Sequence, residues 1–397
     1  MRCLSLFSGA GGLDIGLEAA GFEILANVEA DADCCNTLRL NGAQCVIAQP
    51  IERVDPQILL EEIRLRPGEL DLLAGGPPCQ PFSKSALWAS GAAQGLLDQR
   101  ARTLDHYFTY VAQLRPKAFL IENVEGFKNG GGIDYVESRV HLLREHGLDY
   151  VLNWRLIDAA EFGVAQHRRR LFGVGLLRGF EFSFPHARFG TRDEPFLTAW
   201  DACSDASRTD YVEDLTIKGR WAQLIPSIPE GQNYLWHTAR GGGEPLFGWR
   251  TRYWSFLLKL SKNKPSPTLV ANPSQNSGPF HWDNRLLSTP ELARIQGFPI
   301  SYRFAGGRAS RQRQIGNAVP PPLAAALGRQ IIHALGREPN STASLLIPRA
   351  SATPPVAKVD RVPETYLVLR GEHEAHPGTG RGPRPRNVLT LPTVSVG

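Results

Sequence analysis

One cysteine, Cys79, follows directly after a predicted strand and is a candidate reactive thiol. The apolar run Leu70–Ala74 ends in two glycines and two prolines, and Cys79 follows at once. This pattern predicts a buried strand that stops abruptly and presents the thiol on a stiff loop, because proline fixes φ and removes a backbone donor. Open α/β sheets place their chemistry at this end of their strands. The alternative is a small hydrophobic residue buried in a turn, as a free cysteine often is.

A glycine-rich turn near the start of the chain indicates a cofactor site. The apolar run Arg2–Phe7 leads into Phe7–Gly16, whose glycines allow a ligand to approach the backbone. Glu29 lies about 20 residues after Gly9, where an acid can accept both ribose hydroxyls of an adenosine-containing cofactor. Asp14 replaces the third glycine of the G-x-G-x-x-G pattern, which disfavours a nicotinamide cofactor. A tight turn with a surface glutamate is the alternative.

A carboxylate and three arginines are further candidates. Glu122–Val124 follows the apolar run Ala118–Ile121, and Arg168, Arg169 and Arg170 are consecutive. Taken alone, the acid is explained as a strand-end cap and the arginines as a phosphate-contacting face. Their meaning therefore depends on the motifs around them.

Repeated β-α units are expected to position these residues. Apolar runs predict strands at 2–7, 24–28, 44–47, 70–74, 118–121, 150–157 and 171–176. Amphipathic stretches predict helices at 13–20, 31–40, 55–66, 103–114, 133–146, 291–296 and 323–335. This alternation predicts an α/β fold with a doubly wound, mostly parallel sheet.

The pattern changes after about residue 177. From His186 to Asn284 the sequence is rich in Gly, Pro, Trp and Arg with little periodicity, which predicts a second, smaller, irregular and β-rich domain. We expect a catalytic and cofactor-binding region at 1–185 that is completed by 300–337. The second region then covers 186–299, and 338–397 is a flexible Pro/Arg-rich tail in which Tyr366–Leu369 is a candidate ordered patch.

Composition limits the classes of protein that remain. The 397 residues carry a formal net charge of +5, which is compatible with a nucleic-acid partner without requiring one. Six cysteines without a Cys-x-x-Cys pair argue against a disulfide scaffold or a zinc site and fit a reduced, cytoplasmic setting. Gly9 interrupts the first apolar run too early for a signal peptide, and no apolar run is long enough to span a membrane.

Taken together and in order, the motifs resemble those of the cytosine-C5 DNA methyltransferase family, of the bacterial restriction–modification type. The segments that carry the resemblance are Phe7–Gly12, Pro77–Ser83, Glu122–Val124, Gln166–Arg170, Arg294–Pro299 and Gln314–Pro320. Single motifs of this kind are weak, but six in the right order are specific. The resemblance implies the Rossmann-like fold of S-adenosylmethionine-dependent methyltransferases, with a target recognition domain at 186–299.

The resemblance also implies catalytic roles. Cys79 would be the nucleophile that adds to carbon 6 of a cytosine, which turns carbon 5 into an enamine carbon able to attack a methyl sulfonium. Glu122 would hold N3 and the exocyclic amine, and Arg168 and Arg170 would be the two functional arginines, with Arg168 near O2. Arg169 would point elsewhere, because side chains alternate along a strand.

The implied cofactor is S-adenosylmethionine. Its expected contacts are Phe7, Gly9, Gly11, Leu13, Glu29, Pro78, Leu104 and Asn317. The family's usual aspartate after the third strand is missing, since this stretch reads Ala48–Ile51 without an acid. Gln49 or the backbone would have to hold the adenine amine.

The implied substrate is double-stranded DNA, from which the target base is flipped into the active site. Expected DNA contacts are Gln80, Ser83, Lys84, Gln166, Arg240, Arg250, Arg252 and Thr268. We expect a monomer without a metal, with a cognate restriction endonuclease as a functional partner only.

Three other functions compete with this hypothesis. A tRNA cytosine-C5 methyltransferase would use the same chemistry, but the long second region disfavours it. A catalytically silent DNA-binding relative is disfavoured because Cys79, Glu122 and Arg168 are all present. A dinucleotide-dependent oxidoreductase is disfavoured by the absent G-x-G-x-x-G pattern and by the cysteine loop.

Overall fold

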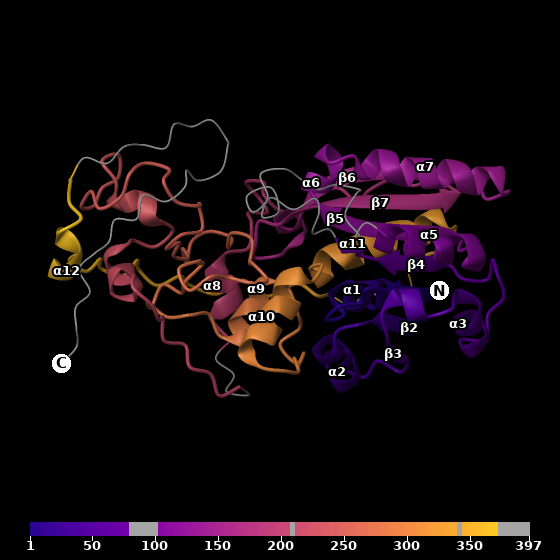
Figure 1. Ribbon diagram of the computed structural model, residues 1–397, viewed down its shortest axis with the longest axis horizontal. Coiled ribbons are helices and arrows are strands. Elements are labelled where there is room, and N and C mark those ends of the chain that lie inside the picture. Colours follow the sequence, from indigo (N-terminus) through magenta and orange to yellow (C-terminus); the bar gives the residue numbers. More distant parts are fainter. Residues whose placement is uncertain (79–101, 207–210, 340–343, 372–397) are drawn as a thin grey trace.

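A seven-stranded sheet with helices on both faces forms the larger half of the protein in a computed structural model (Figure 1). The structure describes residues 1–78, 102–206, 211–339 and 344–371. The strands are β1 (Arg2–Leu6), β2 (Glu23–Glu29), β3 (Val46–Ala48), β4 (Leu72–Gly75), β5 (Ala118–Val124), β6 (Tyr150–Asp158) and β7 (Arg169–Leu177). Their order is β3-β2-β1-β4-β5-β7-β6. Because only the two pairings of β7 are antiparallel, the predicted mostly parallel α/β sheet is confirmed.

The helices follow the predicted alternation in the first half of the chain. In that half they are α1 (Gly12–Ala20), α2 (Ala32–Leu40), η1 (Ile51–Arg53), α3 (Pro56–Glu62), α5 (Arg102–Leu114), α6 (Gly126–Asn129), α7 (Gly132–Glu145) and η5 (Ala159–Phe162). Later helices are α8 (Ala199–Cys203), η6 (Ala222–Ser227), η7 (Tyr234–His237), α9 (Thr289–Ile295), α10 (Arg308–Asn317), α11 (Pro321–Ala334) and α12 (Glu364–Leu367).

The sequence signals at helix ends act as expected, with one difference. The Asp31 carboxylate accepts a hydrogen bond from the Cys34 amide (3.0 Å) at the start of α2. Asp55 likewise caps α3. However, α3 ends at Glu62 rather than near residue 66, because Arg64 has a left-handed φ of 56° and the chain turns to bury Leu65 in the core.

Alternate strand residues face two separate cores. Leu4 and Leu73 join the core under α5 and α7. Their neighbours Cys3 and Leu72 join the core under α1 and α11. This two-sided burial explains why the strands read as continuous apolar runs.

The last long helix returns to the sheet. A Cβ at Gly16 of α1 would lie 2.4 Å from the Ala324 Cβ of α11, and a Cβ at Gly328 would lie 2.8 Å from that of Ala20. The two helices can approach this closely only because glycines stand at both positions. The chain after the second region thus completes the catalytic region.

The second region differs from expectation in its secondary structure. Within 186–206 and 211–299, the structure has short helices and isolated β-bridges but no strand, so the prediction of a β-rich domain is wrong for these residues. Frequent prolines and glycines remove donors and interrupt ladders. An aromatic core that includes Trp221, Tyr234, Phe247 and Phe256 holds this region together instead.

The C-terminal segment also differs from expectation. Residues 344–371, part of the expected flexible tail, are anchored at Ile347 and Tyr366, which are 6% and 7% exposed. The first half of the predicted patch Tyr366–Leu369 lies in α12. Figure 1 shows α12 at the end of the molecule farthest from the sheet. Among the described residues, no helix combines the length and apolar character needed to cross a membrane.

Candidate active site

The loop after β4 and the end of β5 lie against each other. The two strands are parallel neighbours, with Gly75 opposite Ile121. A Cβ at Gly76 would lie 3.0 Å from Glu122 Oε2, so the glycine leaves room for the carboxylate. The Asn123 side-chain amide donates to the Pro77 carbonyl oxygen (3.4 Å). Cys79 itself lies outside the described residues, as do Gln80, Ser83 and Lys84.

Glu122 is a buried carboxylate paired with Arg170. The Arg170 Nε lies 3.0 Å from Glu122 Oε1, and their side chains are 16% and 12% exposed. The antiparallel register places Val124 opposite Arg170, so Glu122 is its diagonal neighbour. Burial raises the pKa of Glu122 above its ordinary value, although the guanidiniums of Arg170 and Arg168 act to lower it.

Arg168 connects this carboxylate to the last motif. It is 1% exposed and donates from Nη2 to the Gly316 carbonyl oxygen (2.8 Å), beside Asn317 at the end of α10. Its backbone amide donates to Asp158 Oδ1 (2.9 Å). Arg169 is exposed and pairs with Glu125 (3.2 Å), so the expected alternation of the three arginines is observed.

The glycine-rich turn contains three residues with left-handed backbone conformations. Phe7, Gly9 and Gly11 all have left-handed φ angles, of 53°, 54° and 73°. The space beyond the Gly9 Cα is open, since no atom lies within 4 Å of where its Cβ would be. The Gly9 amide donates to Glu29 Oε2 (2.7 Å), which fixes the acid at the end of β2 against the turn. Gln49 is exposed at the end of β3.

The other expected cofactor contacts are less uniform. Leu13 and Leu104 are 6% and 2% exposed and pack in the two cores. Pro78 and Asn317 are exposed. Pro78 and Asn317 are therefore open to solvent, whereas the two leucines already have protein neighbours on most sides.

Comparison with known proteins agrees with this geometry. The family model of the C-5 cytosine-specific DNA methylases matches residues 1–333. The Type II methyltransferase M.SacI of Streptomyces achromogenes is 36% identical over 366 residues, which cover 84% of this chain and 93% of the relative. M.NgoMIV of Neisseria gonorrhoeae, also a Type II methyltransferase, is 31% identical over 84% of this chain and 98% of its own.

The fold recurs in solved structures. DNMT2 of Spodoptera frugiperda has a TM-score of 0.58 at 16% identity, over 83% of this chain and 99% of that one. The chain belongs to the C-5 cytosine-specific DNA methylase family. The expected family and activity, DNA cytosine-C5 methylation, are thereby confirmed.

Within this methylase, the expected DNA contacts fall into two groups. Arg240, Arg250, Arg252 and Thr268 are exposed. Gln166 is instead fully buried: its amide donates to Gln296 Oε1 (2.5 Å), and its carbonyl oxygen accepts from the Leu269 amide (2.8 Å). Both ends of this side chain are engaged inside the protein, so its position disagrees with a direct DNA contact.

Sequence reasoning missed a buried polar cluster beneath the glycine-rich turn. Asp14 accepts hydrogen bonds from Ser5 Oγ (2.6 Å) and from the Asn27 amide (2.8 Å). Ser8 of the turn donates to Ser5 Oγ (2.9 Å). Burial raises the pKa of Asp14 to about 7. The sequence signal for this cluster was Asp14 on the apolar face of a helix, because a buried acid needs hydrogen-bond partners.

Tyr302 was also missed. Its hydroxyl donates to the Ala10 carbonyl oxygen (2.8 Å), and it lies 2.9 Å from where a Cβ of Gly11 would be. The contact spans most of the chain, so no local pattern could predict it.

Proposed function

We propose that this methylase modifies cytosine in duplex DNA with S-adenosylmethionine as methyl donor, as the modification enzyme of a Type II restriction–modification system. The similarity to M.SacI and M.NgoMIV supports the biological role. One observation supports the chemistry most: the Glu122 carboxylate is buried between the loop that leads to Cys79 and the guanidinium of Arg170. Cytoplasmic location, a monomeric state and a separate cognate endonuclease belong to the same proposal.

Cys79 is the proposed nucleophile. Its thiolate forms a bond to C6 of the flipped cytosine, and the C5–C6 double bond becomes an electron pair available at C5. After C5 is methylated, the C5 proton leaves, the double bond re-forms and the C6–S bond breaks to return the thiolate. Gly76 to Pro78 run directly from β4 toward Cys79, which supports its placement at the carboxyl end of the sheet.

Glu122 is the proposed partner of the cytosine N3 and exocyclic amine. Negative charge develops on the ring when the thiolate adds, and a proton shared at N3 relieves it. A carboxyl can supply that proton only if its pKa is high enough, and burial raises the pKa of Glu122. Arg170 holds the carboxylate in place, and Arg168 is proposed to face O2.

The residues around the glycine-rich turn fit S-adenosylmethionine. Glu29 offers carboxylate oxygens to ribose hydroxyls, and the space beyond Gly9 is open. Phe7, Gly9, Gly11, Pro78 and Asn317 are the proposed further contacts. When bound, the cofactor supplies an electrophilic methyl group. We assign Leu13 and Leu104 a supporting role behind these residues because they are buried.

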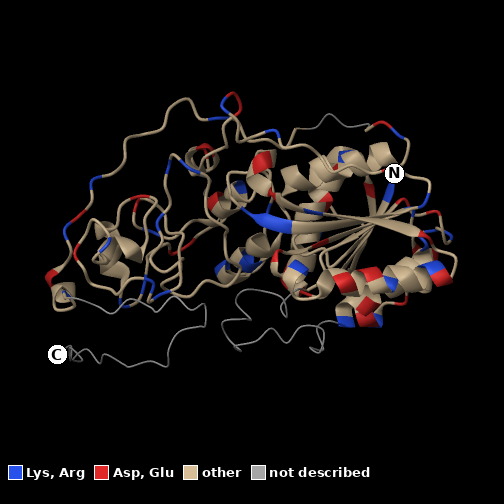
Figure 2. Cartoon of the chain, turned by 90° about the horizontal axis from the view of Figure 1, so that it is seen from above, with Lys and Arg blue, Asp and Glu red and all other residues tan. Residues whose placement is uncertain are grey.

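The second region is the proposed reader of the DNA sequence. Figure 2 shows basic residues distributed along its loops. Arg240, Arg250, Arg252 and Thr268 are the described candidates, and Gln80, Ser83 and Lys84 are candidates on the catalytic side. Gln166 supports Leu269 next to Thr268 and thereby positions the contact rather than making it.

Duplex DNA that contains 5-fluorocytosine at the target position tests the proposal. Fluorine replaces the C5 hydrogen that must be lost as a proton before the C6–S bond can break. The covalent adduct with Cys79 should therefore persist. We expect a protein–DNA complex that survives denaturation, requires S-adenosylmethionine and is absent with Cys79→Ser. Cys203→Ser is the matched control, because Cys203 is a buried cysteine far from the loop in sequence. Adduct formation with tRNA but not with DNA would contradict the proposal.

A further inference from the structure

Residues 344–371, hereafter the strap, lie beyond the segment that matches the family model, which ends at residue 333. The strap begins on the catalytic region. A Cβ at Gly163 would lie 2.3 Å from the Leu346 Cδ2, so this leucine packs directly on the backbone just after η5. Ile347 is 6% exposed and belongs to the core that contains Leu292 of α9. The start of the strap is therefore fixed a few residues from the catalytic arginines.

The strap next follows α8. The Ala350 amide donates to Asp201 Oδ1 (2.8 Å), and the Trp200 indole donates to the Ala352 carbonyl oxygen (2.7 Å). Arg349 donates to the carbonyl oxygen of Phe196 (3.4 Å). Two of these bonds use strap backbone and side chains of α8, so they hold the path of the segment with little dependence on its own side chains, while Arg349 adds a bond from its side chain.

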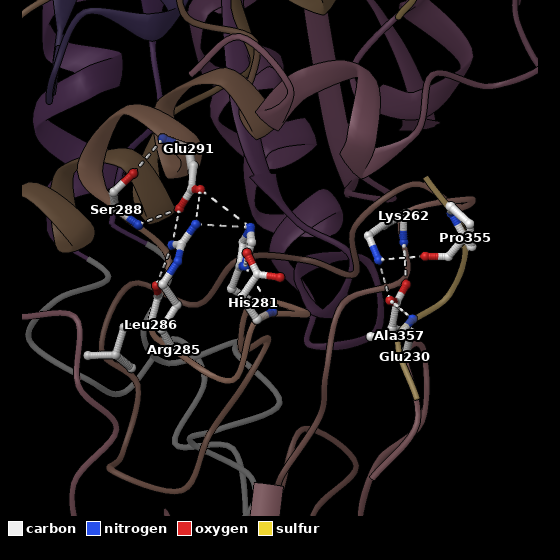
Figure 3. A network of polar contacts seen from close by, with 10 residues as sticks. Glu230, Lys262, His281, Arg285, Leu286, Ser288, Glu291, Pro355 and Ala357 are labelled. Carbon is white, nitrogen blue, oxygen red and sulfur yellow. Dashed lines mark hydrogen bonds and ion pairs between the residues drawn. The ribbon is translucent and has the colours of Figure 1, made fainter. Parts of the chain in front are cut away.

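The middle of the strap covers a buried ion pair (Figure 3). Lys262 and Glu230 are paired, with side chains 7% and 3% exposed. The Pro355 carbonyl oxygen accepts from Lys262 Nζ (3.3 Å), and the Ala357 amide donates to Glu230 Oε1 (3.1 Å). A buried pair needs such additional hydrogen bonds to offset its loss of hydration. The strap thus completes an electrostatic site of the second region.

The end of the strap reaches the aromatic core. Tyr366 stacks on Trp221 with ring centroids 5.7 Å apart and an interplanar angle of 19°. Its hydroxyl donates to the Arg220 carbonyl oxygen (2.6 Å). Arg370 donates to both carboxylate oxygens of Glu244 (2.8 and 2.7 Å).

These contacts connect to the segments that carry the candidate DNA contacts. Glu244 ends the glycine-rich loop that begins at Arg240. Trp221 packs on Phe256 (6.1 Å), over which Arg252 lies at 5.9 Å. A glycine-rich loop closed by a single β-bridge, between Thr238 and Phe247, loses much entropy when it is ordered, so an anchor at its end matters.

We propose that the strap is a positioning element for sequence recognition, which holds the loops 239–244 and 249–254 at a fixed place relative to the catalytic region. This inference rests on the proposed role of the second region as the DNA reader. The contacts of Tyr366 and Arg370 named above involve neither the glycine-rich turn nor Glu122. Loss of strap contacts should therefore affect DNA and leave the cofactor site unchanged.

Steady-state methylation by full-length variants tests the inference. Tyr366→Ala removes the stack on Trp221, and Tyr366→Phe, which keeps it, is the matched control. We expect the KM for DNA to rise about tenfold in Tyr366→Ala, the expected order for a displaced recognition loop, with a smaller ratio of rates on cognate and single-mismatch duplexes. The KM for S-adenosylmethionine should stay unchanged, and Tyr366→Phe should resemble the wild type.

A charge exchange keeps the test independent of folding. Arg370→Glu places two acids together at an exposed site, so we expect a rise of about threefold in the KM for DNA, and Arg370→Glu with Glu244→Arg should restore it. An unchanged KM for DNA and mismatch ratio in Tyr366→Ala would overturn the inference. So would a loss of kcat alone, which reports fewer folded molecules. Failure of the wild type to methylate DNA would instead refute the proposed function.

Discussion

In the catalytic region, the reactive side chains stand at the ends of hydrogen-bonded strands, whereas in the second region the candidate DNA contacts stand on loops without strands. Glu122 and Arg170 are placed by the register of β5 and β7. Arg240 and Arg252 lie over the rings of Trp249 and Phe256. The first arrangement uses backbone bonds that almost any sequence can make, and the second depends on particular side chains.

The difference has a functional meaning. The chemistry of cytosine methylation is the same at every target, so a repeated backbone scaffold can carry it. The recognised sequence differs between methylases, and loops held by side chains can change without disturbing the sheet. Variants in the two regions should therefore fail in different ways.

The largest effect is expected from the catalytic residues. Cys79→Ser should abolish methyl transfer while DNA binding persists, and Glu122→Gln should slow transfer about 10²–10⁴-fold, because an amide can donate a hydrogen bond to N3 but cannot transfer a proton to it. Single-turnover transfer and gel-shift binding measure the two properties separately. Equal loss of binding and transfer in both variants would show that these residues act through the fold instead.

The next effect concerns the buried ion pair of the second region. Lys262→Met leaves Glu230 buried without its partner, so we expect the free energy of unfolding to fall by about 3–5 kcal/mol. Lys262→Met combined with Glu230→Leu should recover most of that loss, because no isolated charge remains. Urea denaturation followed by tryptophan fluorescence measures both. A double variant as unstable as the single one would contradict this account of the region.

A shift in pH dependence is expected when Arg170 is removed. The Arg170 guanidinium lowers the pKa of Glu122, so Arg170→Ala should raise it further. If the protonated carboxyl is the active form, the single-turnover rate of methyl transfer in Arg170→Ala should decline with pH only at a higher pH than in the wild type. The maximum rate should be lower than in the wild type. Arg169→Ala is the matched control, since this exposed neighbour pairs with Glu125. A decline at the same pH as in the wild type in both variants argues against Glu122 as the proton source.

The smallest effect concerns Asp14. Its pKa is raised from 3.8 to about 7, so the folded state holds a proton that the unfolded state releases. Stability from this group is present at low pH and is lost as pH rises from about 4 to about 7. Asp14→Asn should therefore flatten the fall in Tm between pH 5 and pH 8 by roughly 5 °C. Exposed Glu52→Gln should leave the slope unchanged, and an identical slope in Asp14→Asn would refute the shift.

Sequence reasoning located the catalytic region well because its signals are local. The spacing of apolar residues, capping residues such as Asp31 and turns such as Phe7–Gly16 all act within a few residues of the chain. The predicted helix after Asp31 and the predicted first two strands are found in the structure. The second region and the strap were poorly predicted for the opposite reason. Contacts such as Tyr366 on Trp221 join distant segments and have no periodic trace in the sequence. Gln166 shows the same limit, because a motif cannot tell whether a side chain faces DNA or a buried partner.

Bisulfite sequencing of DNA from cells that express the full chain tests the central claim most directly. Bisulfite converts unmethylated cytosine and leaves 5-methylcytosine unchanged. We predict unconverted cytosines at one short recurring sequence in cells that express the wild-type chain, and conversion of the same cytosines in cells that express Glu122→Gln. Bisulfite conversion of every cytosine in cells that express the wild-type chain as soluble protein would contradict the account.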